Sequence, residues 1–130
     1  MEKKEHIKFW LESAEHDLET AESLFHSAKY DWCLFIGHLI LEKVLKANYI
    51  ANNNNKFPPK IHNLVQLSEA ALIILTEEQK IFLDEVNDFN LEVRYPAYKS
   101  EFYKLCTKEY CDKYFNKIKE FYQWLKSLQE

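Results

Sequence analysis

Residues 31–49 read DWCLFIGHLILEKVLKANY, and the first two-thirds of this segment is almost continuously apolar. The length of the segment and its lack of turn residues predict a helix rather than a strand. A helix that is apolar nearly all round needs neighbours on several sides, so we expect it to be the central helix of a bundle. His38 and Glu42 interrupt it, and their spacing of four residues places them on one face.

The composition of the chain indicates an all-α protein with a single domain. A length of 130 residues suits one domain spanning 1–130, and a hydrophobic content of 47% is ample for one core. One glycine and three prolines leave few turn signals for a fold of many strands. We therefore predict an up-and-down antiparallel bundle of four main helices plus one short helix.

Apolar spacings of three and four residues and a few local signals place the other elements. Helices are predicted over 5–28, 31–49, 61–74, 77 to near 92 or 93, and 108–128, with a loop over 50–60 and a loop or short helical turn over 94–106. We expect Asp31 and Thr107 to cap the helices that follow them, and Thr76 and Gln79 to form a capping box. Small Ala14 and Ala21 should allow a second helix to approach closely.

Charge and targeting signals argue against several classes of protein. The net charge of −4 is a poor match for nucleic acid across the whole surface, although lysines in residues 43–60 could form a local basic face. Solvated lysines at a helix end and in a loop are the simpler explanation of those residues. The N-terminus lacks an apolar signal core and no apolar run is long enough for a membrane span, so we expect a cytoplasmic protein without membrane contact. Three cysteines without a CxxC pair suit reduced thiols, and Cys33 is expected in the core.

An ordered set of aromatic, small and polar residues runs through the chain from about residue 5 to residue 125. Its members are Trp10, Ala14, Asp17, Ala21, Leu24, Phe35, His38, Glu42, Lys43, Leu45, Lys46, Ala47, Pro59, His62, Leu64, Arg94, Tyr95 and Pro96. The set resembles the HEPN domain (higher eukaryotes and prokaryotes nucleotide-binding domain) of the nucleotidyltransferase-associated type. The order of the residues carries the resemblance, and the usual HQA-type step reads His38-Leu39-Ile40 here.

This resemblance implies a helical bundle that often forms homodimers. It also implies pairing with a minimal nucleotidyltransferase, as a substrate-binding partner or as the toxin half of a toxin–antitoxin module. Many HEPN proteins are metal-independent ribonucleases, whose signature is an arginine with a histidine a few residues downstream. In this chain no histidine follows Arg94, the only arginine. Arginine can bind phosphate but cannot perform acid–base chemistry, so we expect no catalytic residue.

We expect a ligand-binding set instead. It consists of Arg94, Tyr95, His38, Glu42, Lys43 and Lys46. Each residue also has a structural interpretation: Arg94 could form a salt bridge with Asp88 or Glu92, and His38 could be a satisfied core residue. Tyr95 could pack against the preceding helix, and the lysines could be solvated. No HExxH motif or Cys–His set suits a metal, and we expect no cofactor.

Three functions remain open at this point. The first is a non-catalytic HEPN-type module that binds a nucleotide-like ligand or a minimal nucleotidyltransferase partner. The second is a metal-independent ribonuclease with an atypical site around Arg94, although neither His38 nor His62 has the required spacing from it. The third is an oligomerisation or adaptor bundle. The expected partners are a second copy of the chain, a nucleotidyltransferase, and a nucleotide or RNA.

Overall fold

A computed structural model describes residues 1–129, and these residues form helices and loops without any strand. The elements are α1 (Lys3–His26), α2 (Tyr30–Asn52), α3 (Leu64–Ala70), α4 (Glu77–Asn87), the 3₁₀ helix η1 (Leu91–Val93), α5 (Pro96–Leu105) and α6 (Lys108–Ser127). The all-α bundle expected from the sequence is therefore confirmed.

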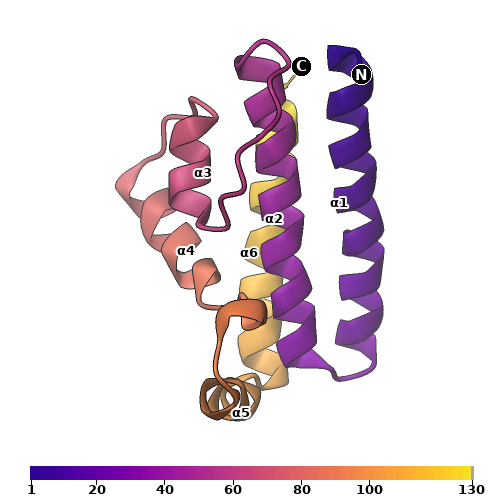
Figure 1. Cartoon of the computed structure of the whole chain (residues 1–130). Helices are drawn as coiled ribbons and strands as arrows, with labels where there is room; N and C mark the ends of the chain where they lie inside the picture. The colour runs from indigo at the N-terminus through magenta and orange to yellow at the C-terminus, as the bar shows by residue number, and fades with distance from the viewer. Residues whose placement is uncertain (130) are drawn as a thin grey trace.

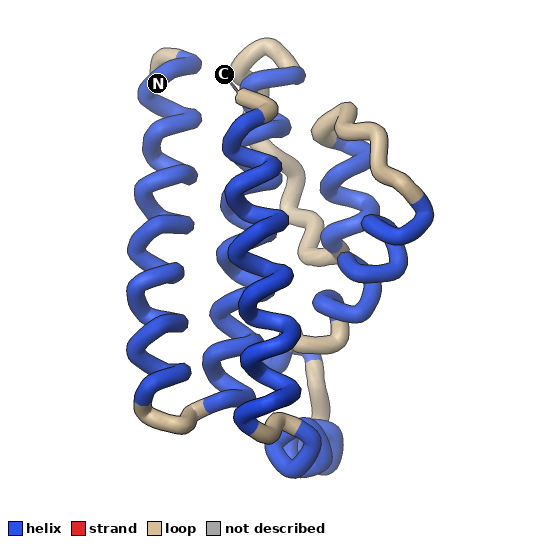
Figure 2. The backbone as a smooth tube through the Cα atoms, turned by 180° about the vertical axis from the view of Figure 1, so that it is seen from behind, coloured by secondary structure: helices blue, strands red, loops and turns tan. Residues whose placement is uncertain are grey.

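The central helix of the bundle is α2. It lies antiparallel to α1 on one side and contacts α6 and α3 on others (Figure 1). Seen from behind, α1, α2 and α6 are the three long helices, while α3 and α4 stand to one side of them (Figure 2). The short helix α5 lies at the end of the bundle where α1 passes into α2 (Figure 1).

Small residues allow the long helices to approach α2 closely. Ala14 and Ala21 of α1 are 0% exposed, as expected for close contact between α1 and α2. Gly37 of α2 faces α6, where a Cβ atom at this position would lie 2.8 Å from Cδ1 of Ile118. The only glycine of the chain is therefore used for helix contact, because a side chain there would push α6 away.

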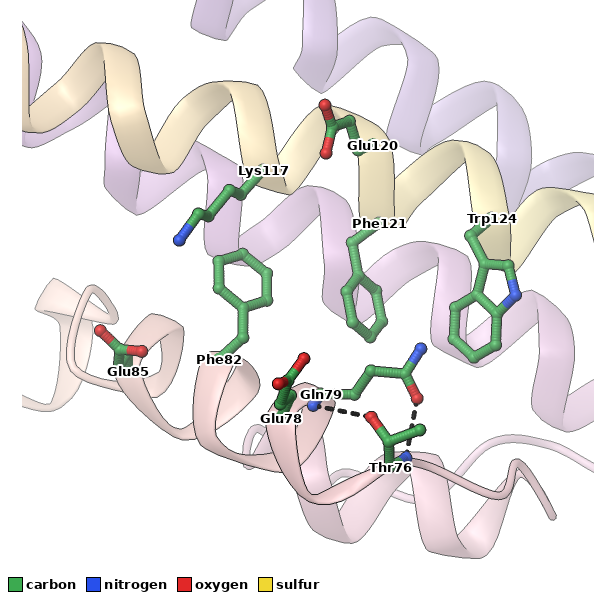
Figure 3. A pocket seen from close by; sticks show the side chains of 9 residues that line it. All are labelled: Thr76, Glu78, Gln79, Phe82, Glu85, Lys117, Glu120, Phe121 and Trp124. Carbon is green, nitrogen blue, oxygen red and sulfur yellow. Dashed lines mark hydrogen bonds between the residues drawn. The ribbon is translucent and has the colours of Figure 1, made fainter.

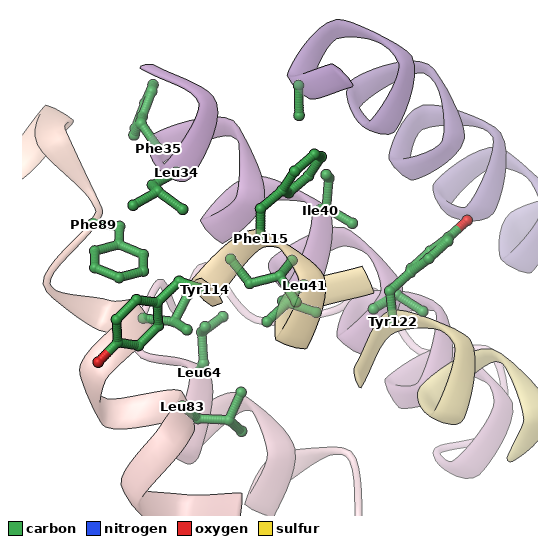
Figure 4. Packing of buried hydrophobic residues seen from close by; sticks show 14 of the residues in the cluster. Leu34, Phe35, Ile40, Leu41, Leu64, Leu83, Phe89, Tyr114, Phe115 and Tyr122 are labelled. Carbon is green, nitrogen blue, oxygen red and sulfur yellow. The ribbon is translucent and has the colours of Figure 1, made fainter. Parts of the chain in front are cut away.

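The core gathers around α2, and buried side chains of α3, α4 and α6 pack against it (Figure 4). Leu41 of α2, Leu64 of α3 and Leu83 of α4 are all 0% exposed, and Phe115 of α6 is 2% exposed. Cys33 is also buried, in agreement with the sequence. Because one helix collects apolar side chains from all these elements, its burial stabilises their mutual arrangement.

Both ends of the central helix differ from expectation. The helix begins at Tyr30, so Asp31 lies in its first turn and is not its cap. It continues past Tyr49 to Asn52, because Ile50 extends the apolar stripe and is 0% exposed. Asn54 and Asn55 then adopt left-handed backbone angles, with φ of 53° and 63°, and these end the helix.

The third and fourth helices are shorter than expected. α3 covers only Leu64–Ala70 of the range 61–74, and Leu72 follows it with a φ of 63°. α4 ends at Asn87, well before residue 92, and the chain tightens into η1.

The segment 94–106 is more regular than the expected loop or short turn, because α5 occupies ten residues of it. Pro96 occupies the first turn of α5, where proline is well tolerated. At the other end of the chain, α6 ends at Ser127, one residue before the expected end, and Leu128 is 45% exposed.

The expected caps of α4 and α6 are present. Thr76 and Gln79 form a complete capping box at the start of α4. The Thr107 side chain accepts a hydrogen bond from the backbone N–H of Tyr110 at the start of α6. No helix in residues 1–129 combines the length and the apolar character that crossing a membrane requires.

The contact between Gly37 and Ile118 gives a first prediction. Gly37→Ala should destabilise the protein by about 1 kcal/mol, because the overlap with Cδ1 of Ile118 outweighs the better helix propensity of alanine. Ile118→Val, which removes Cδ1, should cost about 1 kcal/mol alone. The double variant should then be more stable than the sum of the single variants predicts, by about 1 kcal/mol or more. Urea unfolding of the four proteins measures this coupling, and strictly additive losses would contradict it.

Candidate functional site

A buried carboxylate on α2 lies at the centre of the polar residues that the sequence singles out. Glu42 is 6% exposed. Its Oε1 lies 3.0 Å from Nδ1 of His62, and its Oε2 accepts a hydrogen bond from Nζ of Lys46 at 3.1 Å. Lys46 is one turn further along the same helix, where positions four apart are neighbours.

His62 reaches Glu42 because the chain after α2 returns along that helix. Asparagines attach this returning segment to its surroundings: Asn52 donates a hydrogen bond to the carbonyl of Ala71 at 2.9 Å, and Asn53 donates one to the carbonyl of Ala70 at 3.2 Å. Asn55 accepts from Nδ1 of His6 at 3.0 Å. The run of asparagines therefore ties the segment to α1 and α3.

His38 is a buried residue that holds the returning segment against α2. It is 1% exposed, and its Nε2–H donates to the backbone carbonyl of His62 at 3.1 Å. Its Nδ1 is buried without a hydrogen-bond partner. Burial lowers the pKa of the imidazole below its ordinary value, and the neighbouring Glu42 only partly offsets this. His38 is therefore a neutral buried residue, but only one of its two ring nitrogens is satisfied, which differs from the satisfied core residue of the structural interpretation.

The two lysines proposed as phosphate contacts face carboxylates of the chain itself. Lys43 forms an ion pair with Asp17 of α1 at 2.6 Å. Lys46 is paired with Glu42, and its ammonium group lies 5.0 Å from the ring centroid of Trp10. The structure thus brings Lys46 together with His38 and Glu42 but directs Lys43 toward α1. Their role as ligand contacts stays a prediction.

Arg94 lies between η1 and α5, where it is held on several sides. Its Nη2 donates to Oδ1 of Asp88 at 3.2 Å and to the carbonyl of Asn87 at 3.4 Å. Its guanidinium lies 4.8 Å from the ring centroid of Tyr98. The side chain is 30% exposed and that of Asp88 is 64% exposed. The alternative of a salt bridge with Asp88 is therefore confirmed, and Glu92 is not the partner.

Two aromatic residues follow this arginine at the start of α5. Tyr95 is 84% exposed and occupies the N-cap position without a side-chain hydrogen bond to the helix. It does not pack against α4. Tyr98 does, because its hydroxyl donates to the carbonyl of Asp88 at 2.9 Å. Burial and the Asp88 carboxylate raise the pKa of Tyr98, so the hydroxyl remains a donor at neutral pH.

Asn87 connects the Glu42 cluster with the Arg94 region. Its Oδ1 accepts from the backbone N–H of Leu64 at 2.8 Å, two residues after His62, and its carbonyl accepts from Arg94. The positive charge of Arg94 also contributes to lowering the pKa of His38. The two groups therefore belong to one electrostatic neighbourhood.

Sequence reasoning did not include His62, Tyr98, Asn87 or Trp10 in the binding set. His62 is one of the residues that carry the HEPN resemblance, but no spacing rule joins it to Glu42 across an irregular segment of the chain. Periodicity along α2 can place Lys46 on Glu42, but only the fold shows which carboxylate faces Lys43. Among residues 1–129, no three His, Cys, Asp or Glu side chains are grouped as metal ligands would be.

The comparison with protein-family models settles the family. The model described as the HEPN domain matches residues 7–128, which is nearly the whole chain. The chain belongs to the HEPN family. No curated protein and no solved structure gave a match.

Within this HEPN domain, the buried charge of Glu42 gives a second prediction. Glu42→Gln should lower the free energy of unfolding by about 3 kcal/mol, because it leaves the largely buried Lys46 ammonium without its counter-charge. Glu12→Gln is the matched control, because Glu12 pairs with Lys8 at 3.7 Å on the surface with 69% of its side chain exposed. The control should cost less than about 0.5 kcal/mol. Equal losses in urea unfolding would show that burial of the Glu42 pair is not what matters.

Proposed function

We propose that this HEPN domain is a non-catalytic module that binds a nucleotide-like, phosphate-bearing ligand at Arg94. One observation carries the proposal: a partly exposed guanidinium is held in place by a carbonyl and an aromatic ring, while its one charged partner within residues 1–129 is a surface carboxylate. An ion pair this exposed contributes about 1 kcal/mol or less to stability. A phosphate can therefore displace Asp88 at little cost.

The surroundings of Arg94 suit such a ligand. Tyr95 follows Arg94 directly in the sequence, and its exposed ring offers a surface on which a base can stack. The first turn of α5 has no side-chain cap, and the uncapped backbone N–H groups of a helix N-terminus favour an anion. His38, Glu42, Lys43 and Lys46 then support the arrangement mainly by ordering α2 and the segment that carries His62.

The non-catalytic part of the proposal rests on chemistry. Cleavage of RNA requires a group near Arg94 that can exchange protons at neutral pH, and the sequence contains no histidine after residue 62. Arginine keeps its proton, so it contributes binding and charge stabilisation alone.

We extend the proposal to protein partners. Exposed apolar side chains surround α5: Val93, Tyr95, Tyr103 and Leu105 are 62%, 84%, 66% and 53% exposed. Exposed apolar side chains concentrated in one short segment suit contact with a second copy of the chain or a minimal nucleotidyltransferase, in a pair such as a toxin–antitoxin module. If a small nucleotidyltransferase is encoded beside this chain, co-expression of the two followed by size-exclusion chromatography with light scattering tests both partners.

Calorimetric titration with ATP and GTP tests the ligand. Arg94→Ala should weaken binding at least about tenfold, because it removes charge-assisted hydrogen bonds to phosphate. Asp88→Asn should tighten binding, since it removes the carboxylate that competes for Arg94. Asp84→Asn, an exposed change of the same kind on α4, should leave the affinity unchanged. The absence of heat with native protein, or equal affinities for the three variants, would contradict the proposal.

A ribonuclease is the second candidate, and one observation favours it. Glu42 is buried and binds Nδ1 of His62, whose side chain is 54% exposed. A carboxylate that orients an accessible imidazole in this way is a common arrangement for acid–base chemistry. His62, rather than His38, is therefore the residue that would compensate for the missing downstream histidine.

An RNA cleavage assay decides between the two candidates. If the domain is non-catalytic, the native protein, Arg94→Ala and His62→Gln should all leave RNA intact. Cleavage by the native protein that both substitutions abolish would replace our proposal with the ribonuclease. Cleavage that survives both substitutions would exclude this site as its source. Circular dichroism of each variant provides the control for folding.

A further inference from the structure

A groove between α4 and α6 lies apart from the Glu42 cluster and the Arg94 site. Its volume is about 600 Å³. Phe121 and Trp124 of α6 point toward α4, and Phe82 points back from α4 (Figure 3). The capping box of Thr76 and Gln79 closes one end (Figure 3).

The floor of the groove is aromatic and partly exposed. The rings of Phe82 and Phe121 stack with centroids 5.6 Å apart and an interplanar angle of 28°. Trp124 meets Phe121 edge to face with centroids 5.3 Å apart. Because the three rings support one another, the apolar floor is already formed without an occupant.

The rim of the groove is acidic. Glu78 and Glu85 of α4 and Glu120 of α6 line it, and in residues 1–129 none of the three is part of an ion pair. Glu85 accepts a hydrogen bond from the Tyr114 hydroxyl. Among the described residues that line the groove, Lys117 is the one cation, and its ammonium group lies 5.9 Å from the Tyr114 ring centroid. The remaining negative charge repels phosphate and attracts cations.

The dimensions of the groove match a short stretch of helix. Its lining runs from Glu78 to Glu85 on α4 and from Lys117 to Trp124 on α6. At a rise of 1.5 Å per residue each side is about 10 Å long, or two helical turns. A groove between two helices with an apolar floor receives the apolar stripe of an amphipathic helix, while flanking charges select its polar face.

We propose that this groove docks a cationic amphipathic helix of another protein, with its apolar stripe on Phe82, Phe121 and Trp124 and its lysines or arginines against Glu78, Glu85 and Glu120. Apolar contact with the rings supplies the affinity, and the acidic rim selects the partner. The site is independent of the Arg94 ligand, so either proposal can fail without the other.

The test uses a fluorescein-labelled helical peptide with leucines at spacings of three and four and lysines elsewhere. Fluorescence anisotropy should detect binding to the full chain, and a peptide with glutamate in place of every lysine should not bind. Glu120→Lys should weaken binding about tenfold, because it reverses a charge on the rim. Glu19→Lys is the matched control, since Glu19 is an exposed mid-helix residue of α1 outside the groove. It should change the affinity less than about twofold.

Further variants separate the alternatives. Trp124→Ala should weaken binding through the apolar floor, and if that variant does not fold, Glu78→Gln tests the rim without touching the core. Arg94→Ala should leave binding unchanged. Equal losses in Glu120→Lys and Glu19→Lys would show a response to net charge alone and overturn the proposal. Displacement of the peptide by spermine at similar affinity would overturn it in favour of a small polycation. Conversion of a native dimer to monomers by Glu120→Lys would overturn it in favour of a second copy.

Discussion

The buried carboxylate of Glu42 is the interaction on which the arrangement of this HEPN domain depends. A carboxylate that is 6% exposed must be compensated, and Lys46 and His62 do so from two directions. Lys46 comes from the same helix, so it adds little long-range order. His62 comes from beyond α2, so its contact with Glu42 fixes where the returning chain lies.

The position of His62 helps to determine where the elements that follow it lie. Its carbonyl accepts from buried His38, which leaves the backbone direction at this point little freedom. Leu64 then begins α3 with its N–H bound to the side chain of Asn87, and the carbonyl of Asn87 accepts from Arg94. A chain of hydrogen bonds therefore leads from the core of α2 to the partly exposed guanidinium. The binding group at the surface is placed by a polar network that begins inside the bundle.

The sequence predicts the parts of this fold that depend on local signals. Apolar periodicity finds the long helices, and the threonines at 76 and 107 mark the starts of α4 and α6. Pro96 shows the limit of such signals, because proline both stops a preceding helix and starts a following one. The extension of α2 to Asn52 depends on burial of Ile50, which is a property of the packed bundle.

The candidate site was less predictable, because its contacts join residues that are distant in sequence. Residue types identified Arg94, Glu42 and Lys46 as candidates, but the pairing of Lys46 with Glu42 became evident only in the structure. Nothing in the pattern of α2 specifies that Asp17 of α1 should face Lys43. The same limit explains His62, whose spacing from Arg94 was unsuitable, whereas its contact with Glu42 depends on how the chain returns along α2.

Charge separates the two surfaces for which we propose ligands. At Arg94, a cation held by neutral groups needs only to exchange one exposed carboxylate for a phosphate. In the groove between α4 and α6, carboxylates surround an aromatic floor, and a phosphate would meet repulsion there. α4 contributes to both, since Asp88 follows its last turn and Glu78 lies in its first. The two surfaces nevertheless use different side chains of α4 and carry opposite charges, so each can bind its ligand without the other.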